Sequence, residues 1–246
     1  MISTASVIQS INQFNRKERY FLVAHALGQD REDGQAKSFR LSETFAKRLS
    51  ESVSLLQVPA EARCWMDYHM DWLYAALVEC APPGPPPHTS PFRDEDGNPY
   101  NLNSNQEDID LLVAFEDRSG KLQLILVEAK GYTAWGSDQL RSKGRRLRDI
   151  FGEGKSPYYP DLDLDVHFVM ASPAKPKHGA AYLDSFPDWA IHEGQLSWLP
   201  LFLPEYRKKP TRCDETGSSS QSGDLWRVDD VHIENSQEAV RASLGD

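Results

Sequence analysis

The chain has 246 residues, of which 39% are hydrophobic, and its formal net charge at pH 7 is −10. This length can bury a core without crosslinks, and this composition is typical of a globular protein rather than a disordered one. The acidic balance argues against a protein that coats nucleic acid non-specifically, because phosphate contacts need a basic surface, although a local basic patch can exist in an acidic chain.

The cysteines and the apolar runs indicate the compartment. Cys64, Cys80 and Cys213 lie far apart, and no two have the spacing of a zinc knuckle or a redox pair. A reduced compartment is the simplest interpretation. The first residues lack a basic patch followed by an apolar stretch, and no apolar run approaches the roughly 20 residues that span a bilayer. We therefore expect a cytoplasmic protein that does not contact a membrane.

The first third of the chain favours helices. Apolar residues recur at helical spacing over residues 4–26, and again over 42–56, where Ser42 is a suitable N-cap. Residues 60–80 are apolar around most of a helical surface, which predicts a third, buried helix. The proline-rich segment 81–87 predicts a semi-rigid extended connector.

The middle of the chain predicts a β-hairpin. Two apolar runs, 109–115 and 122–130, flank a short polar turn that contains glycine. In this hairpin the numbers of paired residues sum to about 238, which places Asp110 opposite Glu128. A neighbouring register would shift the pairing by one residue, and the sequence alone does not fix it. Glu128 and Lys130 are two residues apart and point to the same side of their strand.

The elements after the hairpin complete an α/β pattern. We expect a helix that Ser137 caps, then a strand, an extended segment and two late short strands; these elements cover residues 137–151, 165–171, 196–203, 225–228 and 231–233. The last ten or so residues are interpreted as a loose tail or a short helix. Helix, hairpin, helix and strand in this order predict a mixed central sheet flanked by helices.

Two carboxylates and an amine at one end of an apolar hairpin fit phosphodiester hydrolysis. Charged groups rarely occupy such a place unless they are paired or hold a metal. Carboxylate oxygens bind hard divalent cations, which neutralise phosphate charge and lower the pKa of bound water. A lysine beside them can orient the attacking water or stabilise developing charge.

This segment resembles the core of the PD-(D/E)xK nuclease superfamily, whose fold is restriction-endonuclease-like. The resemblance covers roughly residues 60–172. It implies that Asp110 and Glu128 bind Mg²⁺ (or Mn²⁺) and that Lys130 is catalytic. It further implies that Glu79, on the preceding helix, is a third metal ligand and that Gln139, on the following helix, belongs to the catalytic set.

Several alternatives stay open at these positions. Asp71 and Asp67 are rivals of Glu79, and Asp108 is a rival of Asp110. The family name implies a proline before the Asp, and this chain has Ile109 there. Many members of the superfamily also lack that proline. The whole cluster is also readable as a structural ion-pair group at the end of a sheet.

The helix after the hairpin carries a basic patch. From residue 141 to 155 there are six basic and two acidic residues, a local charge of +4 in a chain of −10. Such a patch could follow a phosphate backbone, and the alternative is a solvated helix face. The residues that we expect to bind nucleic acid, DNA in the first instance, are Arg141, Lys143, Arg145 and Arg148.

We therefore expect a metal-dependent nuclease with an N-terminal helical extension (1–58), a restriction-endonuclease-like core (59–205) and a C-terminal extension (206–246). One alternative is a catalytically inactive nuclease fold that binds nucleic acid or a protein partner. Another is an interaction protein that forms a homodimer through its N-terminal helices and the proline-rich connector.

Overall fold

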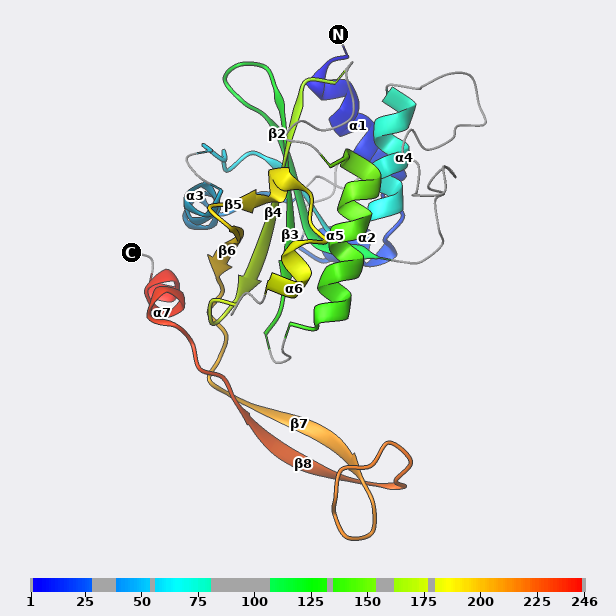
Figure 1. Ribbon diagram of the computed structural model, residues 1–246, viewed down its shortest axis with the longest axis vertical. Helices are drawn as coiled ribbons and strands as arrows, with labels where there is room; N and C mark the ends of the chain where they lie inside the picture. Colours follow the sequence, from blue (N-terminus) through cyan, green and yellow to red (C-terminus); the bar gives the residue numbers. More distant parts are fainter. Residues whose placement is uncertain are drawn as a thin grey trace.

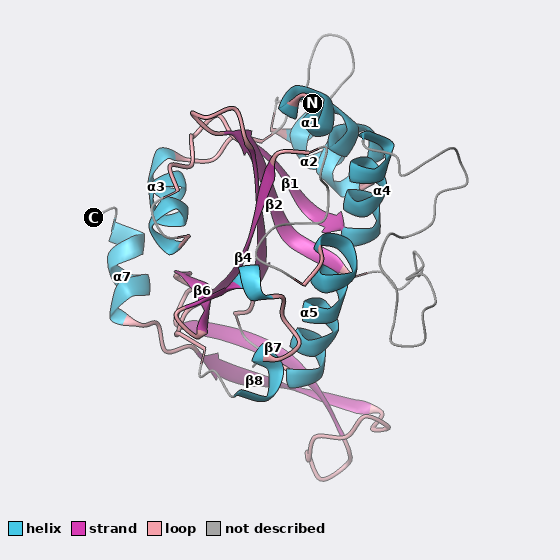
Figure 2. Ribbon diagram, turned by 45° about the horizontal axis from the view of Figure 1, so that its top comes forward, coloured by secondary structure: helices cyan, strands magenta, loops and turns pink. Residues whose placement is uncertain are grey.

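A computed structural model describes residues 2–27, 39–53, 56–80, 107–131, 135–153, 162–176 and 180–244. Its centre is a six-stranded mixed sheet with helices on both faces, so the expected α/β class is confirmed (Figures 1 and 2). The proline-rich segment 81–87 lies outside the described residues. Within the described ranges, every helix is too short or too polar to cross a bilayer.

The sheet joins an antiparallel half to a parallel half. Its order is β1-β2-β3-β4-β6-β5, in which β1, β2 and β3 form an antiparallel meander and β3, β4 and β6 run parallel. The strands are β1 (Arg63–His69), β2 (Asp108–Glu116), β3 (Leu122–Ala129), β4 (Leu164–Ser172), β5 (Ile191–His192) and β6 (Gln195–Pro200).

Helices cover the two faces of the sheet unequally. On one face α1, α2, α4 and α5 pack together, and on the other lie α3 and α7 (Figure 2). Because β3 and β4 are parallel, the chain must cross over between them, and α5 makes this crossover. The helices are α1 (Thr4–Phe14), α2 (Glu18–Ala26), α3 (Glu43–Ser52), α4 (Met70–Cys80), α5 (Ser137–Phe151), α6 (Ala180–Leu183) and α7 (Gln237–Leu244), with a 3₁₀ turn at Asp188–Ala190.

The predicted hairpin register is confirmed. Leu111 pairs with Val127 and Leu112 with Leu126, so the numbers of paired residues sum to 238. Both faces of β3 are covered by helices, which is why its residues from Leu122 to Glu128 are all buried. Continued by one residue beyond Leu111 and Val127, this register leads to Asp110 and Glu128.

The single helix expected over residues 60–80 is wrong in its first half. Residues Arg63–His69 form β1, and α4 begins only at Met70, whose N–H donates to the Glu107 carbonyl over 3.0 Å. Aromatic residues such as Trp65 and Tyr68 fit a strand surface well, and the meander buries both of them to 1% exposure.

The N-terminal helices differ from expectation in one detail. The helix predicted for residues 4–26 breaks at Asn15, which ends α1, and α2 then starts at Glu18. Ser42 is confirmed as an N-cap: its hydroxyl accepts from the Phe45 N–H over 3.2 Å. Helix α1 packs in the same buried cluster as the sheet. The two predicted domain boundaries stay predictions.

The C-terminal part contains a hairpin arm that is separate from the main sheet. Strands β7 (Tyr206–Cys213) and β8 (Leu225–His232) pair with each other and extend away from the body (Figure 1). The sequence predicted two short late strands, whereas β8 is continuous and β7 was not expected. The chain then returns to the body, where α7 contacts β6.

Candidate active site

Glu128 and Lys130 come together at the end of β3. Alternate β3 residues pack in the core on the α5 side of the sheet, and Glu128 continues this alternation. The Lys130 Nζ lies 3.7 Å from Glu128 Oε1. The backbone of Lys130 is held as well, since its N–H donates to the Ala171 carbonyl over 2.9 Å. The two side chains therefore share one side of the strand, as predicted.

Asp110 reaches the same place from β2. Its Oδ2 accepts a hydrogen bond of 2.6 Å from the Ala129 N–H, which fixes the exposed carboxylate against the end of β3. The negative charge of Asp110 acts on the neighbouring carboxylate and contributes to the raised pKa of Glu128. The hairpin thus brings one exposed and one buried acid together.

Glu128 is buried and receives two side chains from α5. Its Oε1 accepts from Gln139 Nε2 over 3.1 Å, and its Oε2 lies 3.2 Å from Lys143 Nζ. Gln139 and Lys143 are four residues apart, so they lie on the same face of the helix. Burial raises the pKa of Glu128 above its ordinary value, and the positive charge of Lys143 opposes part of that effect.

A second cluster of polar side chains lies beside Glu128 and is centred on Asp108. The Asp108 Oδ2 is 2.6 Å from Lys17 Nζ, and the Asp108 Oδ1 is 2.5 Å from His69 Nδ1. Burial is the main reason why the pKa of His69 is lowered. Lys143 links the two groups, because its ammonium also donates to the Asp108 carbonyl. Asp108 is thereby engaged by the ammonium of Lys17, between α1 and α2, and by the imidazole of His69 in β1.

The other acids considered as rivals are also paired. Asp71 forms an ion pair with Arg146 of α5, and Asp67 lies 3.1 Å from Arg19. Asp67 has a left-handed backbone, with φ of 51°, at the point where β1 departs from regular pairing with β2. Neither acid has a contact with Asp110 or Glu128 among the described residues.

Glu79 lies elsewhere in the structure. It sits near the end of α4, and its Oε2 accepts a hydrogen bond of 2.7 Å from the Ser10 hydroxyl of α1. No group of three or more His, Cys, Asp or Glu side chains that could hold a metal occurs among the residues that the structure describes. The structure therefore does not bring Glu79 to Asp110 and Glu128.

The basic residues of α5 point in different directions. Lys143 is 4% exposed and contacts Glu128, so it does not present its charge to an external phosphate. Arg148 donates to the carbonyls of Asp184 and Phe186. Arg141 pairs with Asp138 over 3.0 Å at the surface, and Arg145 is exposed.

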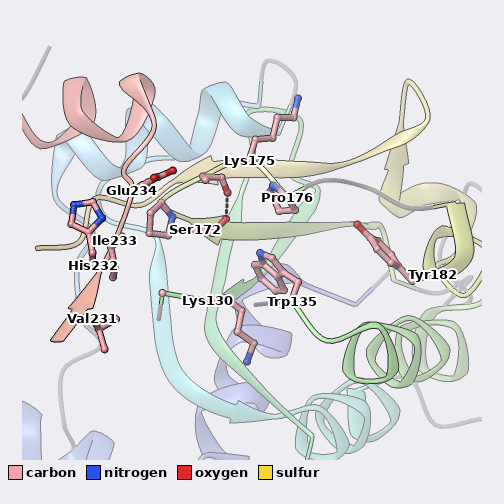
Figure 3. A pocket seen from close by; sticks show the side chains of 13 residues that line it. Lys130, Trp135, Ser172, Lys175, Pro176, Tyr182, Val231, His232, Ile233 and Glu234 are labelled. Atoms are coloured by element: carbon pink, nitrogen blue, oxygen red, sulfur yellow. Dashed lines mark hydrogen bonds between the residues drawn. The ribbon is translucent and has the colours of Figure 1, made fainter. Parts of the chain in front are cut away.

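A pocket of about 480 Å³ opens beside Lys130 (Figure 3). Its walls come from the end of β3, the segment after β4, Trp135, Tyr182 and the base of the β8 strand. Sequence reasoning did not identify Ser172, Lys175 or Tyr182 as neighbours of the site. These residues are far apart in the chain, and no local pattern marks them.

Comparisons with known proteins do not assign the chain. No family model matches it, and no curated protein or solved structure is significantly similar to it. The chemistry of the site must therefore be inferred from its own residues.

Proposed function

We propose that this protein is a metal-dependent nuclease that hydrolyses phosphodiester bonds, with DNA as the expected substrate. The observation that carries the proposal is that Asp110 and Glu128 come together at the end of the hairpin: Asp110 accepts from the Ala129 N–H, its charge acts on Glu128, and Lys130 lies on the same side as Glu128. The arrangement agrees with the resemblance to PD-(D/E)xK nucleases. The three cysteines are free thiols, which supports the cytoplasm as the compartment.

The donor set suits a magnesium or manganese ion. Mg²⁺ is usually bound by one or two carboxylates plus waters and substrate phosphates, and Asp110 and Glu128 supply two. The Glu128 Oε2 is buried and has no hydrogen-bond partner among the described residues, although Lys143 lies close enough for an ion pair. A bound divalent ion would neutralise phosphate charge and make water a better nucleophile.

The remaining residues would position the substrate and the water. The Lys130 ammonium lies beside Glu128, so it can face a phosphate that is held at the two carboxylates. Lys130 also forms part of the pocket wall, although its ammonium points away from the other lining side chains (Figure 3). Gln139 holds one Glu128 oxygen in place through its amide. The aromatic side chains of Trp135 and Tyr182 in the pocket wall offer surfaces on which a base can stack.

One observation favours a second candidate, a nuclease-like fold that binds nucleic acid or protein without cleaving it. Lys143 supplies Glu128 with a counter-charge at 3.2 Å, so the carboxylate is compensated without a metal. A structural ion pair of this kind explains the buried carboxylate without giving it a catalytic role. Titration with Mn²⁺ separates the two candidates, because the binding module has no carboxylate site that takes up the ion.

The test is cleavage of single- and double-stranded DNA and RNA by the purified protein, with Mg²⁺ or with EDTA. We expect metal-dependent cleavage that Glu128→Gln and Lys130→Ala each reduce by about 100-fold or more. Lys121→Ala is the matched control, because it removes a lysine far from the site. The Lys121 Nζ lies 2.8 Å from the Asp165 Oδ1 at the opposite end of β3 and β4. Cleavage that Lys130→Ala leaves unchanged would refute the assignment of Lys130.

A further inference from the structure

The β7–β8 arm presents apolar side chains that nothing covers among the described residues. Four of its large side chains are exposed: Tyr206, Leu225, Trp226 and Val228, with Tyr206 and Trp226 at 70% and 69%. Within the described part of the chain, β8 pairs with β7 and with no other strand. An isolated two-stranded hairpin is marginally stable in water, and its exposed edges invite pairing with another chain.

The two edges of the arm differ in whether they can accept another strand. Pro210 of β7 pairs with Val228 of β8. Proline has no N–H, so it belongs at a position whose N–H would face away from the partner strand. The outer edge of β7 thus lacks a donor at its centre, and the adjacent side chains of Lys208, Lys209 and Arg212 add positive charge to that strand.

The outer edge of β8 has no strand partner within the ranges that the structure describes. In an antiparallel ladder, directly opposed residues either bond to each other or both face outward. Because Pro210 faces outward, the N–H and C=O groups of Val228 also face outward, and the alternation extends this to Trp226 and Asp230. No proline interrupts β8.

We propose that two copies of this chain pair antiparallel through their β8 strands, with Val228 on the two-fold axis. The result is a four-stranded sheet in the order β7-β8-β8-β7, with an isologous interface. In this register Arg227 lies opposite Asp229 of the partner subunit, and Leu225 lies opposite Val231 of the partner subunit. This inference goes beyond the proposed hydrolysis and does not depend on it.

Charge selects this register over its neighbours. A symmetric pairing centred on Arg227 would place two arginines face to face, and one centred on Asp229 would oppose two aspartates. Centring on Val228 opposes unlike charges twice. Arg227 already lies 2.7 Å from Asp229 within each chain, so the dimer would join two such pairs into one alternating network.

Packing agrees with the same register. Trp226 and Val228 are two residues apart and lie on one face of the hairpin. Each Trp226 would stand diagonal to Val228 of the partner subunit, at a separation that an aromatic ring can bridge. Dimerisation would cover the two most exposed apolar residues of β8, Trp226 and Val228.

Oxidative crosslinking tests the pairing directly. The Val228→Cys variant should form a disulfide-linked dimer. The Cα atoms of directly opposed, hydrogen-bonded residues in an antiparallel pair are about 5.5 Å apart, which is within disulfide range. Lys208→Cys is the control on β7. In the proposed sheet the two β7 strands are three strand spacings apart, so the two Cys residues at position 208 would lie about 14 Å apart or more, too far for a disulfide. Wild-type protein sets the background from its own three cysteines. Equal crosslinking of the two variants would overturn the proposal.

A charge exchange tests the register. Sedimentation of the full chain at about 1–100 µM should show a monomer–dimer equilibrium for the wild type. Asp229→Arg should weaken it by roughly tenfold or more, because arginines then face each other, and the double variant Arg227→Asp/Asp229→Arg should restore it. A wild type that stays monomeric throughout, or an exchange that fails to restore the dimer, overturns it. The proposal would also be overturned if the protein is a monomer that binds DNA and loses this binding in the double variant Lys208→Ala/Arg212→Ala. That result would assign the arm to nucleic-acid binding.

Discussion

Lys143 of α5 and Glu128 of β3 form an ion pair of 3.2 Å in which each residue is only 4% exposed. The pair joins the helix to the strand that carries the candidate catalytic group. A buried charge whose partner is removed is left uncompensated in a medium that solvates it poorly. Lys143 therefore supports the fold at this place, whether or not the site is catalytic.

Removal of the Lys143 ammonium should destabilise the protein. We expect Lys143→Met to lower the free energy of unfolding by about 3–5 kcal/mol, because Glu128 is left buried without its cation. The double variant Lys143→Met/Glu128→Gln should recover part of this loss. Urea unfolding followed by circular dichroism measures both. The control, Lys121→Met, removes a more exposed pair and should cost about 1 kcal/mol or less; an equal loss there would contradict the expectation.

Metal binding should depend on Asp110 and Glu128 and not on Glu79. The carboxylate of Glu79 bonds to Ser10, on another helix, whereas Asp110 and Glu128 meet across the hairpin. By calorimetric titration with Mn²⁺, we expect Asp110→Asn and Glu128→Gln each to weaken binding by about tenfold or more. Glu79→Gln should change it by less than about twofold. A loss with Glu79→Gln as large as that with Asp110→Asn would instead favour the three-carboxylate shell suggested by the sequence.

The sequence predicted the hairpin well because two independent signals agree there. Apolar runs of strand length and a glycine-containing polar turn indicate both strands and the position of the turn. They left a shift of one residue open, and the observed pairing of Leu111 with Val127 decides the register. The boundary between β1 and α4 could not be predicted. Trp65, Tyr68 and Trp72 fit helical spacing, and the choice of a strand depends on pairing with β2.

The role of Lys143 also lay beyond the sequence. A run of basic residues favours a solvated or phosphate-binding face, and only the packing of α5 shows which of them turn inward. The spacing from Gln139 to Lys143 was a usable signal, since residues four apart share a helix face. The pocket beside Lys130 gave no such signal, because its walls come from the ends of separate strands.

Gly144 is required where α5 packs closely on a neighbouring backbone. A Cβ at this position would lie 2.7 Å from the Ser185 carbonyl oxygen and 2.8 Å from its carbon. Alanine favours helices by about 1 kcal/mol over glycine, but the clash must move backbone atoms. We therefore expect Gly144→Ala to lower the unfolding free energy by about 1–3 kcal/mol in urea titrations. The exposed neighbour Arg145→Ala should change it by about 0.5 kcal/mol or less; stabilisation by Gly144→Ala would show that α5 can shift.

Two partly buried groups give the stability opposite dependences on pH. Burial raises the pKa of Asp149 to about 6 from 3.8, with Arg146 opposing the shift. The folded protein therefore holds a proton that the unfolded chain has lost, and stability falls as the pH rises from about 4 to 6. Burial lowers the pKa of His167 from 6.5 to about 4, so the unfolded chain binds a proton first and stability is lost as the pH falls through the same window.

Single substitutions should separate the two effects. Asp149→Asn removes the aspartate effect, so stability should increase more steeply with pH between about 4 and 6.5 than in the wild type. His167→Gln removes the histidine effect, so the change of stability with pH over this window should shift in the opposite direction, toward a decrease, relative to the wild type. Each effect amounts to at most about 3 kcal/mol, the free-energy equivalent of the pKa difference between the folded and the unfolded chain. Urea unfolding at closely spaced pH values measures both slopes. Parallel profiles for the two variants would mean that neither group titrates as its burial requires.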